Sequence, residues 1–304
     1  MRARVTADVR CFFASRGYEE VETPCLVPSP GLDVHLDAFE VRTPSANRYL
    51  HTSPEYQMKR LLADGRARGE TSSRIFQVSR AFREGERGER HNPEFTILEF
   101  YRAPGTMDDT MRDTEQLVAK VTAGQVLLGT RVVATRPPFY RMTVAEAFER
   151  FADMPEETML SLADSDEDTY FRLLVERVEP GLASLDFAIF LTHYPTSQAS
   201  LARTVPHDPR YAERYELYVA GIELCNGFGE LTNVDEQRQR FAKDQAQRRA
   251  LGRPVYPVDE RFLDALGSGL PPCSGNAIGL DRLAALASGT TQIAEVIAFT
   301  DAEL

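Results

Sequence analysis

The stretch AFREGERGERHNPEFTILEFYR, residues 81–102, constrains the fold of this chain more than any other. Alternating apolar residues predict strands at 73–83 and 94–102, and the polar segment 84–92 predicts a long loop that joins them as a hairpin. Arg83 then ends the first strand, and Phe95 lies near the start of the second. An arginine beside an aromatic ring could hold a nucleotide, although such an arginine is more often a surface residue and such a phenylalanine a core residue.

The composition excludes several classes of protein. With 304 residues, 42% of them hydrophobic, the chain can bury a substantial core. A net charge of −11 disfavours a large nucleic-acid interface, because phosphate backbones attract clustered lysine and arginine. The four cysteines form no CxxC pair, which predicts reduced thiols rather than a zinc site or disulfides. No apolar run reaches membrane length and the N-terminus has no signal-peptide core, so we expect a soluble, cytoplasmic protein.

The rest of the chain mixes helical and strand patterns, without repeats or a clear linker. We expect helices at 5–17, 52–65, 143–151, 166–178 and 235–252, strands at 185–195 and 215–231, and a strand that passes into a helix at 269–289. Ala220-Gly221 and Asn226-Gly227 are predicted turns. This order favours a single α+β domain over residues 1–304, built on an antiparallel sheet flanked by helices.

The usual nucleotide-binding motifs are absent from the sequence. It contains no GxxxxGK[ST], and no GxGxxG between a strand and a helix. The segment GNAIG at 275–279 is too short and wrongly placed to replace them. A Rossmann or P-loop fold is therefore disfavoured.

Three separated segments resemble a known family. GYEEVETP (17–24), FRE…HNPEF (82–95) and GNAIGLDRL (275–283) are similar, in order and approximate spacing, to motifs 1, 2 and 3 of class II aminoacyl-tRNA synthetases. The segments TSPEYQMKRLL, RHNPEFTILEFY, GIELCNGFGELTN and PPCSGNAIGLDRL resemble the lysyl branch, and the likeness runs from about residue 5 to residue 299. The resemblance implies the class II catalytic fold, an antiparallel sheet flanked by helices.

The likeness is closer still to the elongation factor P lysine ligase family, through YPTSQASLA (194–202) and PCSGNAIGLDR (272–282). Only sixteen residues precede Gly17, so we expect no anticodon-binding domain. Members of that family activate (R)-β-lysine with ATP and transfer it to a lysine side chain of elongation factor P. The resemblance thus implies a ligase that uses ATP and Mg²⁺, with elongation factor P rather than tRNA as its partner and no membrane association.

The resemblance also implies a nucleotide site. Arg83 would bind the α-phosphate and the attacking carboxylate, Arg282 the γ-phosphate, and Phe95 the adenine ring. The full set of residues expected at ATP is Arg83, Glu84, Gly85, Asn92, Phe95, Glu223, Leu224, Gly279 and Arg282. Gly279 would let the backbone approach adenosine, and Glu223 and Glu230 would bind Mg²⁺.

A cationic amine in a dry cleft needs opposite charge or acceptors. The residues implied for this amino-acid site are Ser53, Pro54, Glu55, Tyr101, Asn226, Glu230 and Ala277. Whether Glu230 serves the metal or the substrate stays open. Ala277 stands where tRNA-charging relatives have glycine, which favours β-lysine over α-lysine.

One departure concerns motif 2, which usually reads FRxE. Here Gly85 takes the glutamate position, with carboxylates on either side at Glu84 and Glu86. This departure favours one alternative, a non-catalytic paralogue that binds lysine or a nucleotide. Two further alternatives are a truncated lysyl-tRNA synthetase that charges tRNA and an asparagine-synthetase-like amidating enzyme. Motif 1, with Gly17, Tyr18, Val21 and Pro24, implies a two-fold symmetric homodimer.

Overall fold

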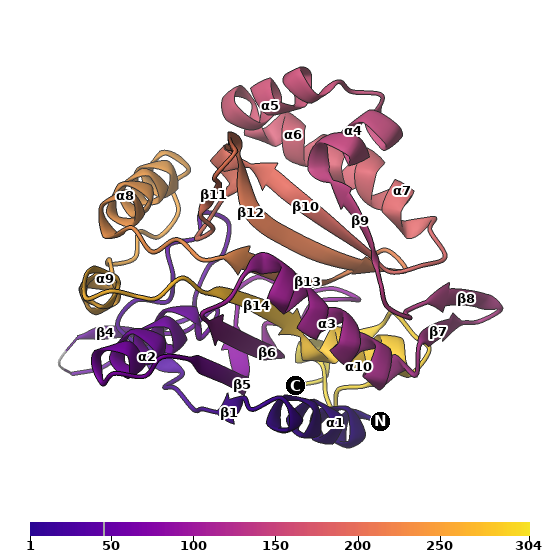
Figure 1. The fold of residues 1–304 in the computed structure, drawn as a ribbon, viewed down its shortest axis with the longest axis horizontal. Helices are drawn as coiled ribbons and strands as arrows, with labels where there is room; N and C mark the ends of the chain where they lie inside the picture. Colours follow the sequence, from indigo (N-terminus) through magenta and orange to yellow (C-terminus); the bar gives the residue numbers. More distant parts are fainter. Residues whose placement is uncertain (45) are drawn as a thin grey trace.

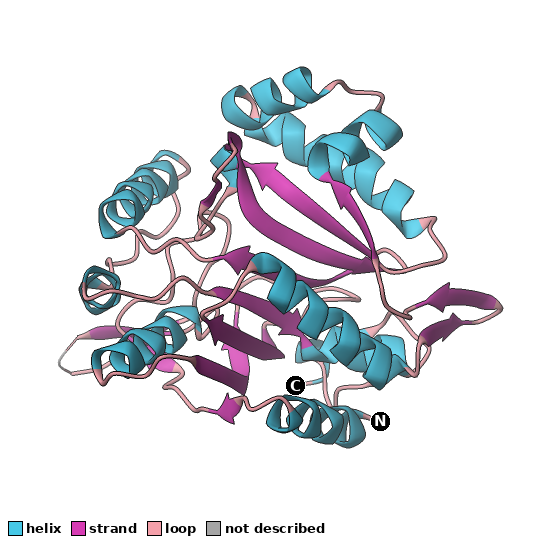
Figure 2. Ribbon diagram, viewed as in Figure 1, coloured by secondary structure: helices cyan, strands magenta, loops and turns pink. Residues whose placement is uncertain are grey.

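The computed structural model describes residues 1–44 and 46–304 and has the expected α+β architecture (Figures 1 and 2). The helices are α1 (Arg2–Ser15), α2 (Glu55–Ala67), α3 (Met107–Thr122), α4 (Val144–Ala152), α5 (Glu156–Ser165), α6 (Glu167–Leu173), α7 (Glu179–Ala183), α8 (Val234–Ala250), α9 (Glu260–Gly267) and α10 (Leu280–Ala287). A π-helical segment, η1 (Leu174–Val178), joins α6 to α7, and three 3₁₀ turns are η2 (Thr196–Gln198), η3 (Ile293–Glu295) and η4 (Asp301–Glu303).

A nine-stranded sheet forms the centre of the molecule, in the order β1-β5-β6-β14-β13-β12-β10-β9 with β11 paired to β12. Its strands are β1 (Glu19–Glu20), β5 (Ser73–Phe82), β6 (Glu94–Ala103), β9 (Tyr140–Thr143), β10 (Ile189–Pro195), β11 (Thr204–Val205), β12 (Asp208–Val219), β13 (Ile222–Gly229) and β14 (Ser274–Gly279). All its pairings are antiparallel except β1 with β5 and β9 with β10.

Two small sheets lie outside this central one. One contains β2 (Leu26–Val27), β3 (Glu40–Arg42) and β4 (Asn47–Leu50), and the other β7 (Gln125–Leu128) and β8 (Arg131–Ala134). Within the described residues, no helix is long and apolar enough to cross a membrane.

The hairpin predicted from residues 73–102 is confirmed. β5 pairs with β6 from Ser73 opposite Ala103 to Phe82 opposite Glu94, without a register shift. Helix α1 ends before Gly17, whose φ of 72° lies in the left-handed region favoured at the end of a helix. Pro54 is the residue before α2 rather than part of its first turn, and the Ser53 hydroxyl accepts a hydrogen bond from the Glu55 amide.

One predicted turn is wrong. Ala220 and Gly221 form a turn between β12 and β13, but Asn226 and Gly227 lie inside β13. Gly227 is paired with Tyr215, and a Cβ on it would lie 2.3 Å from Cζ of that tyrosine. The glycine is thus needed because an aromatic ring crosses the strand there, not because the chain turns.

The register of the three central strands β6, β14 and β13 aligns their residues in rows that run across the sheet, and two of these rows bear on the site. Glu99 pairs with Ala277, which pairs with Asn226, so these three residues lie in a row across the sheet. The adjacent row is Leu98, Ile278 and Cys225. Because successive side chains of a strand point to opposite faces, one row faces a polar layer and the other an apolar core.

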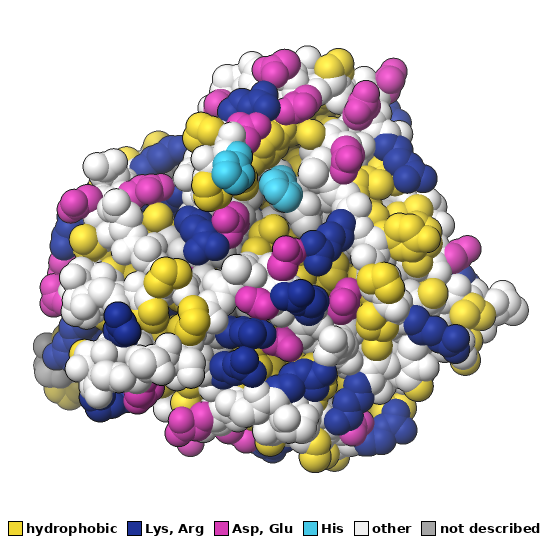
Figure 3. All heavy atoms as spheres, in the orientation of Figure 1, with side chains coloured by type: hydrophobic (Ala, Val, Ile, Leu, Met, Phe, Trp, Pro, Cys, Tyr) yellow, Lys and Arg dark blue, Asp and Glu magenta, His cyan; other side chains and the backbone are white. Residues whose placement is uncertain are grey.

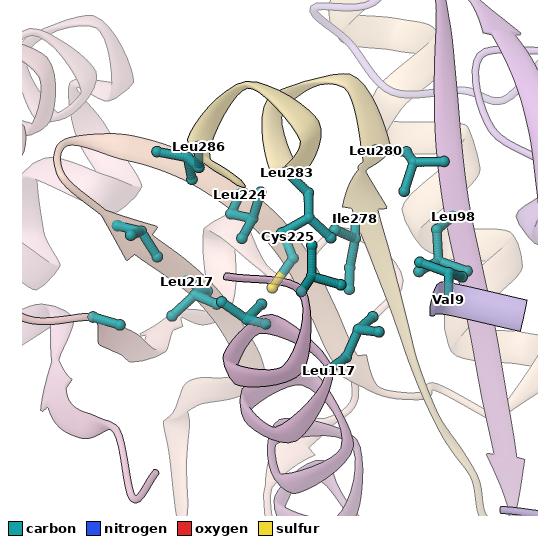
Figure 4. Packing of buried hydrophobic residues seen from close by; sticks show 14 of the residues in the cluster. Val9, Leu98, Leu117, Leu217, Leu224, Cys225, Ile278, Leu280, Leu283 and Leu286 are labelled. Atoms are coloured by element: carbon teal, nitrogen blue, oxygen red, sulfur yellow. The ribbon is translucent and has the colours of Figure 1, made fainter. Parts of the chain in front are cut away.

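The apolar face is covered by α1, α3 and α10, whose buried residues pack with the row that contains Leu98 and Ile278. Figure 4 shows Leu283 and Leu286 of α10 directed toward Leu224 of β13. On the other face, α2, α8 and α9 build a second core, and α4 to α7 pack against the β10 end of the sheet to form a third. The apolar face therefore fixes the position of the polar one.

The crowding at Gly227 gives a stability prediction. We expect Gly227→Ala to lower the free energy of unfolding by about 1–3 kcal/mol, because its methyl group would overlap the Tyr215 ring. Gly267→Ala is the matched control, since a Cβ there would have no neighbour within 4 Å among the described residues, and it should leave stability unchanged or raise it. Urea unfolding measures both, and an unchanged Gly227→Ala protein would contradict the role assigned to this glycine.

Candidate active site

A cavity of about 350 Å³ opens above the polar row of the sheet. Its walls come from the loop between β2 and β3, the start of α2, the β5–β6 hairpin, β13, and the junction of β14 with α10. The predicted site residues that line it are Ser53, Glu55, Arg83, Asn92, Phe95, Glu223, Leu224, Asn226, Ala277, Gly279 and Arg282. The predicted residues outside its lining are Pro54, Glu84, Gly85, Tyr101 and Glu230.

Arg83 and Phe95 face each other across the base of the hairpin. The Arg83 guanidinium lies 5.0 Å from the centre of the Phe95 ring, and its Nε donates to the Thr52 carbonyl at 3.4 Å. The guanidinium and the ring are therefore held together at one end of the cavity.

The turn after Arg83 explains the departure from motif 2. Gly85 has a φ of 86°, which glycine adopts at little cost. Glu84 is exposed, and its amide donates to the Asp37 carbonyl at 2.7 Å. Glu86 is the carboxylate that lines the cavity, with Oε1 3.4 Å from Nη1 of Arg83. The left-handed turn at Gly85 thus places Glu86, and not Glu84, beside the arginine.

Arg282 lies in the first turn of α10, and the chain after β14 delivers it to the same end of the cavity. Its Nη1 donates to the Glu223 carbonyl at 2.6 Å, and its Nη2 lies 2.7 Å from Nε2 of His91. Burial and the nearby Arg282 charge lower the pKa of His91. A neutral His91 therefore accepts the Arg282 hydrogen bond.

Asn92 and Gly279 also line the cavity, and the contacts of Asn92 serve the hairpin loop. The Asn92 side-chain amide donates to the Glu94 carbonyl at 2.7 Å and accepts from the Asp301 amide at 2.9 Å, so it holds the hairpin loop in shape. A Cβ on Gly279 would meet Arg282 at 3.4 Å, an ordinary contact. The protein's own packing therefore does not require glycine at this position.

Behind the cavity lies a buried ion pair that the sequence did not reveal. The Lys59 side chain is 1% exposed, and its Nζ lies 2.6 Å from Oε1 of Glu55 and 2.5 Å from Oε2 of Glu230. Burial alone would lower the pKa of Lys59, but the two carboxylates raise it. Lys59 therefore stays charged.

Glu99 adds a third carboxyl group to this cluster. It is 1% exposed and accepts hydrogen bonds from the Ser53 hydroxyl at 2.6 Å and the Tyr101 hydroxyl at 2.5 Å. Burial, reinforced by Glu55, raises the pKa of Glu99 to about 7. Burial likewise raises the pKa of Glu230, and the charge of Lys59, 2.5 Å away, opposes this shift.

The cluster of Glu55, Glu99 and Glu230 therefore has more acid groups than its one lysine can neutralise. Glu230 Oε1 has no hydrogen-bond partner within the described residues. Buried unpaired acceptors are costly unless a proton or a cation reaches them. The arrangement suits an incoming ammonium group.

Asn226 extends this cluster toward the middle of the cavity. Its Oδ1 is buried and, among residues 1–44 and 46–304, accepts no hydrogen bond. Asn226 lies in the row with Ala277 and Glu99. The row thus offers acceptors on either side of Ala277, whose methyl group is part of the cavity lining.

Glu223 and Glu230 do not share one environment, although both were expected at the metal. The Glu223 side chain is 42% exposed in the cavity, with Oε2 3.5 Å from Nη1 of Arg282. Its pKa is raised by desolvation and by the nearby charge of Glu216. Glu230, by contrast, is 1% exposed and paired with Lys59. Within the described residues no three metal-binding side chains gather.

The residues missed by the sequence analysis left partial signals. Lys59 stands four residues after Glu55, which was among the predicted site residues, and this i, i+4 spacing is that of a helical ion pair. Glu99 alternates with Phe95 and Tyr101 on one face of the predicted strand. Glu216 gave no such signal, because its bonds to Arg214 at 2.7 Å and Tyr218 at 2.8 Å, and its proximity to Glu223, depend on the β12–β13 pairing.

Comparison with known proteins agrees with this geometry. The family model for tRNA synthetases class II (D, K and N) matches residues 1–303. A Salmonella dublin protein named elongation factor P–(R)-beta-lysine ligase is 42% identical over 322 residues, which cover 98% of this chain and 93% of that protein. Proteins of the same name from Salmonella paratyphi B and Salmonella heidelberg show the same identity and coverage.

The buried carboxyl of Glu99 gives a pH prediction. Its pKa rises from an ordinary 4.5 to about 7 on folding, so between these values the folded chain holds a proton that the unfolded chain has lost. This group therefore lowers the free energy of unfolding as the pH rises from about 5 to about 7, by at most about 1.4 kcal/mol per pH unit. Glu99→Gln removes the titration and should gain stability relative to the wild type over that window.

Urea unfolding at several pH values measures this difference. Glu94→Gln removes an exposed carboxylate from the same strand and controls for the loss of one charge. A difference between wild type and Glu99→Gln that stays constant with pH would contradict the raised pKa.

Proposed function

This chain belongs to the class II tRNA synthetase family of the D, K and N type, and on that premise we propose that it is a ligase that joins (R)-β-lysine to elongation factor P. The observation that carries the proposal is a single cavity with two chemically different ends. One end holds Arg83, Phe95 and Arg282, and the other lies against a buried carboxylate cluster around Lys59. The relatives named for this activity match nearly the whole chain.

The first step activates the amino acid. Its carboxylate attacks the α-phosphorus of ATP, an acyl-adenylate forms, and pyrophosphate leaves. Arg83 binds the α-phosphate and the attacking carboxylate, while Arg282 binds the γ-phosphate. Guanidinium groups suit this task because they donate two parallel hydrogen bonds to phosphate or carboxylate oxygens. No enzyme nucleophile is needed, so catalysis rests on positioning and charge neutralisation.

The adenine ring stacks on Phe95, beside Asn92 and the backbone at Leu224 and Gly279. Phe95 is half-buried at the cavity wall, and Arg83 already lies over its ring. Glu86 takes the place left by the missing motif 2 glutamate, since it lines the cavity beside Arg83. Glu84 and Gly85 contribute through the shape of the turn.

The opposite end binds the amine groups of the amino acid. Glu55 lines the cavity, and behind it Glu99, Tyr101 and Glu230 form a buried acceptor wall. An ammonium group brought by the substrate neutralises the excess carboxylate charge. Ser53 and Pro54 set the start of α2, which carries Glu55 into place.

Mg²⁺ is the metal that such a reaction uses, and the residues fit it in part. Glu223 supplies a hard oxygen ligand on the cavity wall, whereas the nearby Glu216 is buried and already bound to Arg214 and Tyr218. One or two carboxylates with substrate phosphates are the usual Mg²⁺ ligands in proteins. When bound, the ion neutralises phosphate charge. Glu230 belongs to the amine end instead, because it is paired with Lys59. The metal requirement is tested by adding a chelator, which should abolish the ligase activity.

Transfer follows activation. The ε-amine of a lysine on elongation factor P attacks the acyl carbon of the adenylate, an amide bond forms, and AMP leaves. Ala277 favours β-lysine over α-lysine, because a single methyl group in a substrate pocket shifts selectivity by about 1–3 kcal/mol. Without that methyl group the pocket would admit a different placement of the amino group, so the Ala277 side chain is the point at which the two isomers are told apart.

We extend the proposal to the partners and place of the reaction. Residues 1–304 act as one catalytic domain that modifies a protein rather than tRNA, since the net charge is −11 and basic side chains lie interspersed with acidic ones on the face shown in Figure 3. A gel-shift assay with tRNA tests this. The four free cysteines suit the reducing cytoplasm, which cell fractionation tests.

The chain acts as a homodimer in this proposal. Tyr18 of motif 1 is buried and donates to Asp113 at 2.6 Å, so it supports the fold of the segment from within. Pro24 and Leu26, further along, are exposed, with Leu26 45% exposed beyond the edge strand β1. Sedimentation analysis of the wild-type protein distinguishes a dimer from a monomer.

The function is tested by incubating the protein with elongation factor P, ATP and (R)-β-lysine, followed by mass spectrometry of elongation factor P. We expect one β-lysyl group to be added to a lysine. Arg83→Lys should lower the rate about 100-fold or more, because lysine cannot form the paired hydrogen bonds of a guanidinium. Arg87→Lys is the control, since Arg87 is exposed and bound to Asp301 at 2.7 Å. Unmodified elongation factor P after incubation of the folded wild-type protein with all substrates would contradict the proposal.

A further inference from the structure

The loop of residues 31–37, between β2 and β3, forms one wall of the cavity without belonging to any helix or strand. Gly31, Leu32, Asp33 and Leu36 line the cavity from this loop. Leu32 is 1% exposed and packs in the same apolar core as Tyr56 and Tyr101. The loop therefore shares an apolar core with Tyr101, whose hydroxyl donates to Glu99 of the buried carboxylate cluster.

The residue just before this loop, Pro30, is bonded to the segment that leads into α2. Thr52 donates to the Pro30 carbonyl through both its amide, at 3.4 Å, and its hydroxyl, at 2.8 Å. Beyond Gly31, whose φ of 117° is accessible to glycine, no strand of the described chain pairs with residues 32–36. The carbonyl groups of the loop therefore need partners from elsewhere in the fold.

Arg248 supplies those partners from the last turns of α8. Its Nη1 donates to the carbonyls of Asp33 at 2.6 Å, Val34 at 3.1 Å and Leu36 at 2.9 Å. Its Nη2 donates to Oδ1 of Asp37 at 2.6 Å, and its Nε to the Pro254 carbonyl at 2.6 Å.

The Arg248 side chain is 0% exposed. The oxygen acceptors of the loop therefore replace the hydrogen bonds to water that its guanidinium group has lost. Its guanidinium also lies 4.5 Å from the centre of the Tyr256 ring, and the Tyr256 hydroxyl accepts from the Ala38 amide at 2.8 Å. The same side-chain cluster thus fixes the loop along its length and just beyond its end.

Asp37, the last residue of the loop, also links it to the nucleotide end of the site. Asp37 forms a second ion pair with Arg253 at 3.0 Å, and its carbonyl accepts the Glu84 amide at 2.7 Å. Glu84 directly follows Arg83. The loop is thus held between α8 and the turn that carries the phosphate-binding arginine.

We propose that Arg248 is a positioning residue for the amino-acid end of the site. It holds the 31–37 loop closed over the carboxylate cluster of Glu55, Glu99 and Glu230. This inference rests on the proposed function and deepens it. A lysine has no planar fork and too few donors in the right directions to reach three carbonyls and a carboxylate at once. Arg248→Lys should therefore release the loop while retaining the positive charge.

The test is the pair of KM values in pyrophosphate exchange, one for (R)-β-lysine and one for ATP. Arg248→Lys should raise the KM for β-lysine about tenfold or more, as expected for lost hydrogen bonds to a charged group. The KM for ATP should change by less than about twofold, because Arg248 binds the Asp37 carboxylate and not the Asp37 carbonyl that accepts the Glu84 amide. Arg249→Lys is the matched control, because Arg249 is the next residue of α8 and is exposed. A purely structural role would lower thermal stability and leave both KM values unchanged, and that result would overturn the proposal.

Amide hydrogen exchange gives a second readout that does not require turnover. Residues 31–37 should exchange faster in Arg248→Lys, while the β5–β6 hairpin strands exchange as in the wild type. If Arg248→Lys does not fold, Asp37→Asn removes the charged partner more gently and should show the same changes to a smaller extent. Unchanged exchange in the loop would overturn the proposal, whereas a wild-type protein without pyrophosphate exchange for any amino acid would instead overturn the proposed function.

Discussion

The buried ion pair between Lys59 and Glu230 is the interaction on which the site depends. Lys59 belongs to α2 and Glu230 follows β13, so the pair ties a helix to the centre of the sheet. Removing one partner of such a pair costs about 3–5 kcal/mol, because it leaves an uncompensated charge in the interior. Glu55 and Glu99 then add acid groups that the single lysine cannot neutralise. Burial raises the pKa of Glu99 to about 7, so the free protein holds a proton on that carboxyl group below this pH, and in our proposal the ammonium group of the substrate replaces it.

The central strands separate this chemistry from the packing that supports it. On one face, Leu98, Ile278 and Cys225 pack under α1, α3 and α10. On the other, Glu99, Ala277 and Asn226 lie toward the cavity. The arginines enter from a strand end and a helix start, where the fold fixes their backbone. A site whose charges are held in advance by a rigid sheet suits a reaction that needs no enzyme nucleophile.

The sequence predicted those parts of the fold that depend on local pattern. The β5–β6 hairpin and the strand that passes into α10 follow from apolar alternation and from helical spacing. The predicted turn at Asn226-Gly227 was wrong, because Gly227 is required by the Tyr215 ring on the neighbouring strand, which leaves no room for a Cβ. Lys59 with Glu230, and Arg248 with the 31–37 loop, are contacts between distant parts of the chain, and no periodicity encodes them. The role of Glu86 likewise emerges only from the left-handed turn at Gly85.

In the mechanism we propose, one cavity couples an amine-binding carboxylate cluster to an arginine-lined nucleotide end. Amino-acid-dependent exchange of pyrophosphate into ATP tests it most directly, with (R)-β-lysine, α-lysine and aspartate measured side by side. We expect exchange to be driven best by (R)-β-lysine and not at all by aspartate, which has no side-chain amine for the cluster to bind. A preference for α-lysine would retain the cluster but overturn the assignment of β-lysine. Exchange with aspartate alone, or with no amino acid, would contradict the proposed ligase activity.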